Sequence, residues 1–91
     1  MQEEQFINAL KAQGFEAPVL VERDAFGELG SHAHPFEAKA LILEGEIRIR
    51  TAEGERTYLA GEIFHLQPDE PHSESFGPQG VRYLSGRRAL R

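Results

Sequence analysis

The sequence contains no cysteine and no tryptophan, and it has a single methionine. The absence of cysteine excludes disulfide bonds, thiolate metal sites and a cysteine nucleophile. No apolar run approaches the ~20 residues that a membrane-spanning helix needs. The opening residues, MQEEQF, are acidic and lack the basic and then apolar pattern of a secretory signal. We therefore expect a cytoplasmic protein that has no membrane partner.

Several other kinds of functional site are also missing. The formal net charge of −5 argues against nucleic acid or an anionic membrane as a main partner. No serine lies on the turn motif that presents a nucleophilic serine, and no glycine loop has a known phosphate-binding pattern. The basic residues within 87–91 are interpreted as a solvated basic tail.

What remains is sufficient for one small domain of 91 residues. Residues 1–14 are predicted to form a short amphipathic helix that Gly14 ends. Residues 17–86 consist of short β-rich runs separated by glycine and proline turns. Within them, Ile47 and Ile49 alternate with arginines, which is typical of a half-buried strand. The pattern predicts an all-β barrel or sandwich preceded by one helix.

Two histidines one residue apart are the first candidate functional residues. His32 and His34 lie in the stretch GSHAHPFEAKALILEGEIRI, and alternate residues of an extended chain point to the same side. His72 lies on a separate predicted strand. Three neutral imidazoles suit zinc, copper, nickel or ferrous iron better than magnesium or calcium. We predict one divalent transition metal bound by these three residues; the alternative is that they are ordinary polar residues at the mouth of a barrel.

The spacing of these histidines resembles that of a small single-domain cupin. The first cupin motif contains a glycine, H-x-H, a glutamate and a second glycine, and near-matching places here hold Gly27, His32, His34 and Gly45. The second motif begins with a glycine and ends near a histidine, and its spacing is matched by Gly61 and His72. The resemblance implies a double-stranded β-helix (jelly-roll) barrel, a homodimer and a small-molecule ligand or substrate.

The sequence departs from that pattern at the motif glutamate. Its position holds Ala38, whereas the neighbouring Glu37 faces the other way on a regular strand, unless a β-bulge turns it inward. Phe36 and Ala38 are candidates for the pocket lining. His65 is expected to face solvent or neighbouring side chains, with entry into the cavity as the alternative. Two further carboxylates flank His72 and are either solvated or orient its ring; they are Glu70 and Glu74.

Three functions follow from these observations. The first is a metalloenzyme acting on a small anionic molecule, because three histidines leave the charge of a divalent ion uncompensated and some coordination positions open. Dioxygenase-like or isomerase-like chemistry is implied by the resemblance alone. The second is a non-catalytic module that binds or senses a small ligand, with a structural metal or none. The third is a stability or assembly protein without a metal site.

Overall fold

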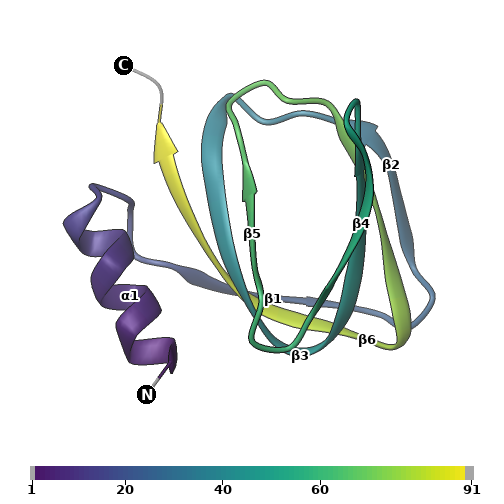
Figure 1. The fold of residues 1–91 in the computed structure, drawn as a ribbon, viewed down its shortest axis with the longest axis horizontal. Coiled ribbons are helices and arrows are strands. Elements are labelled where there is room, and N and C mark those ends of the chain that lie inside the picture. The colour runs from purple at the N-terminus through teal and green to yellow at the C-terminus, as the bar shows by residue number, and fades with distance from the viewer. Residues whose placement is uncertain (1, 90–91) are drawn as a thin grey trace.

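The computed structural model describes residues 2–89, which form one helix and six strands (Figure 1). In chain order the elements are α1 (Gln2–Ala12), β1 (Val19–Arg23), β2 (Glu28–His32), β3 (Phe36–Thr51), β4 (Gly54–Leu59), β5 (Ile63–Leu66) and β6 (His72–Ala89). The predicted all-β architecture with one short N-terminal helix is confirmed. Within residues 2–89, the only helix is too short and too polar to cross a membrane.

Two long strands organise the barrel. β3 and β6 pair antiparallel over almost their whole length, from Phe36 opposite Ala89 to Arg50 opposite Ser73. The hydrogen-bonded order is β1-β6-β3-β4, while β2 also pairs with β6 and β5 also pairs with β3. β6 therefore holds β2 along its first part and β1 along its second part. Both of these shorter strands, β1 and β2, contribute to the wall of the cavity described below.

The two long strands bend where two glycines meet. Gly45 of β3 and Gly80 of β6 both have positive φ angles, 75° and 70°. A Cβ atom on Gly45 would lie only 2.1 Å from the carbonyl oxygen of Gly80. The β3–β6 register shifts on both sides of Gly45, as expected for an irregularity that increases strand curvature. This bend lets β3 and β6 curve around the barrel, as Figure 1 shows.

The core has two parts. The barrel interior is filled by apolar side chains from β3, β5 and β6, and it includes Ile47 and Ile49, which confirms the predicted half-buried strand. The second part lies between α1 and the outer surface of the barrel, where Phe6, Leu10 and Leu41 are buried together. The helix ends at Ala12, shortly before Gly14, the predicted stop, which has a φ of 83°. The helix thus covers an apolar outer face of β3.

The end of β6 corrects one prediction. Arg87 and Arg88 were expected in a solvated tail beyond a barrel ending at residue 86, whereas the structure places both in β6; Arg87 is nevertheless exposed. β6 continues to Ala89, because Arg87 pairs with Ala38 of β3 and Arg88 pairs with Glu37. Residues 90 and 91 of the predicted tail lie outside the described part of the chain.

Candidate metal centre

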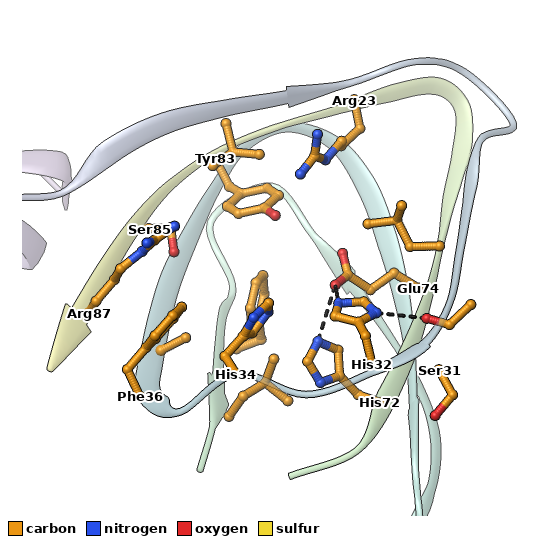
Figure 2. A pocket seen from close by; sticks show the side chains of 16 residues that line it. Arg23, Ser31, His32, His34, Phe36, His72, Glu74, Tyr83, Ser85 and Arg87 are labelled. Carbon is orange, nitrogen blue, oxygen red and sulfur yellow. Dashed lines mark hydrogen bonds and ion pairs between the residues drawn. The ribbon is translucent and has the colours of Figure 1, made fainter. Parts of the chain in front are cut away.

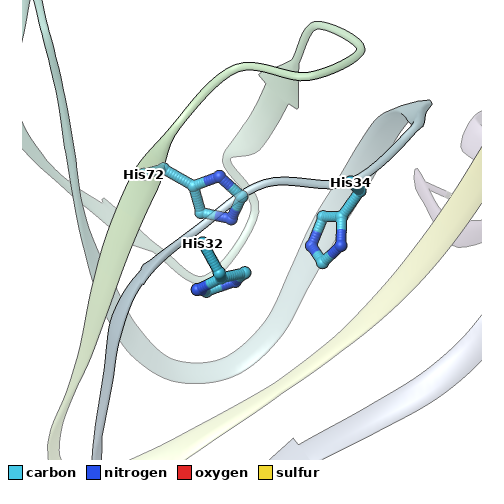
Figure 3. A group of neighbouring side chains, drawn as sticks. All are labelled: His32, His34 and His72. Atoms are coloured by element: carbon cyan, nitrogen blue, oxygen red, sulfur yellow. The ribbon is translucent and has the colours of Figure 1, made fainter.

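The barrel brings the three predicted histidines together. His32 ends β2, His72 begins β6, and the two are paired residues in the β2–β6 ladder. His34 lies two residues beyond His32, in the link to β3. One ring nitrogen from each residue lies within 4.8 Å of the others, and Figure 3 shows the three rings facing a common point. Residues distant in the sequence therefore form one cluster of possible metal ligands.

Two of the rings have a fixed tautomer. Nδ1 of His32 lies 2.7 Å from the carbonyl oxygen of Gly30, and Nδ1 of His72 lies 3.0 Å from that of Glu70. A carbonyl oxygen only accepts hydrogen bonds, so each Nδ1 carries a hydrogen and donates it. In the neutral ring, Nε2 then presents a lone pair to the cluster. This is the usual second contact of a metal-binding histidine.

A carboxylate that the sequence analysis did not place in the site lies between these rings. Oε2 of Glu74 is 3.2 Å from Nε2 of His32 and 3.2 Å from Nε2 of His72. The Glu74 side chain is only 8% exposed. Because Glu74 lies two residues after His72 on β6, the two side chains point to the same face. That period-two spacing was the available sequence signal, but it was read only as a flanking or orienting carboxylate.

The donor atoms of the cluster suit a divalent transition metal. Nε2 of His72 and Oε1 of Glu74 are buried and have no hydrogen-bond partner. Two imidazole lone pairs beside a carboxylate oxygen repel one another unless a cation or a proton lies between them. The rings of His32 and His72 lie close together, with centroids 4.3 Å apart. Nitrogen and oxygen ligands of this kind fit zinc, iron, nickel or copper.

The third histidine, His34, favours the neutral form. Burial lowers the pKa of His34, and the nearby rings of His72 and His32 lower it further, against an opposing effect of Glu74. A neutral imidazole is the form that binds a metal. His34 also stacks on Phe36, with ring centroids 4.9 Å apart and planes inclined by 10°. This stacking holds the ring beside the other two.

The histidines lie in the wall of a cavity of about 540 Å³ (Figure 2). Phe36 and Ala38 line it, so the position of the missing motif glutamate does face the cavity. Opposite the histidines, Tyr83 points its hydroxyl inward. Burial raises the pKa of Tyr83 to about 12, with a further contribution from Glu74. At neutral pH this phenol is therefore protonated and can donate a hydrogen bond.

Glu37 and His65 do not line this cavity. The β3–β6 register is regular from Phe36 to Ile42, so no bulge turns Glu37 inward. Its Oε1 instead accepts hydrogen bonds from Arg88, 2.9 Å from Nε and 2.6 Å from Nη2, while its other oxygen bonds His65. Neither Glu37 nor His65 therefore turns into the cavity, which the sequence analysis had allowed as an alternative for each.

Solved structures of known proteins resemble this fold. A cupin superfamily protein from Desulfitobacterium hafniense matches with a TM-score of 0.69 and 14% identity, over 78% of this chain and 64% of that one. An RmlC-like cupin from Shewanella frigidimarina matches with a TM-score of 0.70 and 23% identity, over 82% and 67%. A variant oxalate decarboxylase from Bacillus subtilis matches with a TM-score of 0.73 and 17% identity, over 91% and 23%.

These likenesses concern the fold and not the activity. This chain spans slightly less than two thirds of the Desulfitobacterium protein and less than a quarter of the oxalate decarboxylase. No protein-family model and no curated relative matches the sequence. The function must therefore be argued from the site itself.

Proposed function

The chain folds as a small cupin domain, a jelly-roll barrel with one N-terminal helix, and on that basis we propose that it binds one divalent transition metal and presents it to a small anionic molecule. The observation that carries this proposal is the meeting of His32, His72 and Glu74. Nε2 of each ring lies 3.2 Å from Oε2 of Glu74, whose side chain is only 8% exposed, and in the neutral rings both nitrogens carry a lone pair. Only a cation or a proton at this point makes the arrangement stable.

The proposed ligands are His32, His34 and His72, with Glu74 as the carboxylate. In the cupin pattern that the sequence resembles, the glutamate belongs to the first motif. Here that position holds Ala38, and the carboxylate comes from β6, two residues after His72. With Glu74 in place of the motif glutamate, the site keeps one negative charge beside the metal and has open space next to Ala38. That space is where a small molecule would approach.

When bound, the metal would supply Lewis acidity and open coordination positions for a small molecule. The chain's own residues have separate roles. The carbonyl oxygens of Gly30 and Glu70 orient the rings of His32 and His72. Tyr83 offers a protonated hydroxyl from the facing wall. Iron, zinc, nickel and copper all suit the donor set.

Catalysis and simple binding are both compatible with this site. A dioxygenase-like or isomerase-like reaction needs an acid or base in the cavity, and Tyr83 and Glu74 are the titratable groups placed for it besides the histidines. One observation favours the second candidate, a binding or sensing module: Glu37 and His65, which the sequence offered as further groups that could enter the cavity, both lie outside it. Oxygen uptake by the ferrous protein with a panel of small acids and diols distinguishes the two.

Metal uptake tests the proposal directly. We expect about one equivalent of transition metal per chain after dialysis against zinc, ferrous, nickel or copper ions, as measured by elemental analysis of tag-free protein. His34→Ala should reduce occupancy sharply and leave the circular dichroism spectrum unchanged. His65→Ala is the matched control, because its ring lies outside the cavity, and it should retain full occupancy. Equal occupancy in the parent and His34→Ala would overturn the ligand assignment.

A homodimer and a cytoplasmic location complete the proposal. The dimer is supported by β1, which is an edge strand of the sheet and leaves Val19 and Leu20 about half exposed. An edge strand that carries apolar side chains is prone to pair with another chain.

A further inference from the structure

The arginines of this chain divide into two groups. Residues 2–89 contain seven arginines, and five of them have a carboxylate oxygen within 3.9 Å: Arg48, Arg50, Arg56, Arg82 and Arg88. The other two, Arg23 and Arg87, have no such partner among the described residues. Both of them line the histidine cavity. In a chain with net charge −5, acidic partners are plentiful, so this distribution is informative.

We propose that Arg23 and Arg87 form an anion-binding wall, and that the molecule presented to the metal is a small dicarboxylate. The inference rests on the proposed function, because the metal would hold one part of the same molecule. Arginine is suited to this role, since its planar fork matches a carboxylate with two parallel hydrogen bonds.

The two arginines lie at opposite ends of one wall. Arg23 of β1 is paired with Val81 of β6, and Arg87 lies six residues further along β6. At ~3.3 Å per residue, their Cα atoms are separated by roughly 20 Å along the strand. Between them, Tyr83 and Ser85 face the cavity, and Figure 2 shows both guanidinium groups turned toward this stretch of the wall. The two long side chains thus bracket Tyr83 and Ser85 with positive charge, and a small acid needs to reach only the space between the guanidinium groups.

Arg87 is held close to the histidines. Its Cζ atom lies 4.6 Å from the centroid of the Phe36 ring. Phe36 in turn stacks on His34, with centroids 4.9 Å apart. The exposed Arg87 side chain is thus held at the cavity mouth, one aromatic ring away from His34.

Arg23 acts on the other end of the cavity. Its charge opposes the rise in the pKa of Tyr83 that burial and Glu74 produce. Tyr83 is the phenol that faces the histidines, so Arg23 and the metal centre lie on either side of it (Figure 2). An anionic group held by Arg23 would lie beside the Tyr83 hydroxyl, which can donate a further hydrogen bond.

The charge balance of the site favours two anionic groups over one. A divalent metal, ionised Glu74 and two arginines together carry a net charge of about +3. A monocarboxylate leaves about two positive charges uncompensated, whereas a dicarboxylate leaves about one. Because the cavity measures about 540 Å³, it has room for an acid of several carbons. The volume of the cavity and the net charge of the site therefore both favour a small dicarboxylate.

The test is calorimetric titration of the zinc-loaded protein with two matched series of acids. The first runs from malonate to adipate, and the second contains the monocarboxylates of equal carbon number. We expect at least one dicarboxylate to bind about 10-fold more tightly than its monocarboxylate, as expected for one additional charge-assisted contact. Arg87→Gln and Arg23→Gln should each weaken dicarboxylate binding, and the double variant should abolish the preference. Arg87→Lys should restore part of it.

Two controls keep the outcomes distinct. Arg82→Gln removes an arginine from the same strand that is already paired with Glu44, so it should leave binding unchanged. The zinc content of every variant is measured separately. A parent that takes up no metal overturns the proposed function together with this inference. A metal-loaded parent that binds both series equally, or a double variant that keeps the preference, overturns the inference alone.

Discussion

Glu74 places Oε2 3.2 Å from Nε2 of His72, two residues earlier on the same strand, and that nitrogen has no hydrogen-bond partner. The nitrogen and the carboxylate both act as acceptors when the ring is neutral with its hydrogen on Nδ1. With the ring in this neutral form, the contact is therefore unfavourable without a metal and favourable around a cation. The same contact therefore affects stability in opposite directions with and without metal, and this difference allows a direct test of the site.

Glu74→Gln should change stability in opposite directions in the two states. The amide can donate a hydrogen bond to a ring nitrogen, so the metal-free variant should gain about 1 kcal/mol and unfold several degrees higher. It also lacks the ligand charge, so its zinc affinity should fall by about ten-fold or more. Calorimetric melting curves with and without zinc measure both effects. Glu28→Gln, an exposed change on β2, serves as the control; a lower melting temperature for metal-free Glu74→Gln would contradict the interpretation.

Glu37 should contribute stability that depends on pH. Partial burial opposes its ionisation, but hydrogen bonds from Arg88 and His65 outweigh this effect and lower the pKa of Glu37 below its ordinary value of 4.5. A lowered carboxyl pKa stabilises the folded state above the ordinary value, and this contribution disappears as the pH falls through the folded-state pKa. The side chain of Arg88 is 42% exposed, so solvent screening limits the contribution.

Comparison of Glu37→Gln with the parent isolates this effect. Urea unfolding should show the variant to be less stable by about 0.5–1 kcal/mol at neutral pH, and the difference should shrink between about pH 5 and pH 2. Glu44→Gln, at a more exposed pair with Arg82, should show little difference at any pH. A difference for Glu37→Gln that stays constant across this range would show that its charge is not responsible.

Gly45→Ala should strongly destabilise the barrel. The added Cβ would lie 2.1 Å from the carbonyl oxygen of Gly80, and the φ of 75° is strained for any side chain. We expect a loss of about 3 kcal/mol in the free energy of unfolding, measured with urea. Gly30→Ala is the control, because nothing lies within 4 Å of the added atom and its φ is ordinary. Equal stability of the two variants would mean that the bend can relax.

The predicted dimer should depend on β1. Light scattering coupled to size-exclusion chromatography should give twice the mass of 10.2 kDa for the parent. Leu20→Asp places a charge on the exposed apolar face of this edge strand and should give the monomer. Leu59→Asp, at an equally exposed position on β4, should remain dimeric. A monomeric parent would contradict the prediction outright.

The sequence was sufficient to predict the histidine cluster because its signals are local. Alternation along an extended chain places His32 and His34 on one side, and Pro35 favours that geometry. The meeting with His72 came from the resemblance to cupins. The same alternation applied to His72 would have identified Glu74 as well, but a carboxylate in a polar stretch is usually solvated, and its burial depends on how β2 and β6 pair.

The arginines show what the sequence could not predict. Arg87 and Arg88 lie near the end of the chain, where no turn or hydrophobic alternation marks the continuation of β6. Their place in the barrel comes from pairing with β3, more than forty residues earlier in the chain. Which of them faces the cavity and which bonds Glu37 depends on that register alone. Long-range pairing of this kind leaves little trace in the local sequence.

The short strand β2 has a consequence for how the molecule moves. It is five residues long, almost entirely exposed, and paired only with β6, with an irregular register between Leu29 and His32. Such a segment opens more readily than the core strands. A metal bound by His32, His34 and His72 would fix the end of β2 to the barrel. Metal occupancy would then set how long β2 stays paired with β6 as part of the cavity wall.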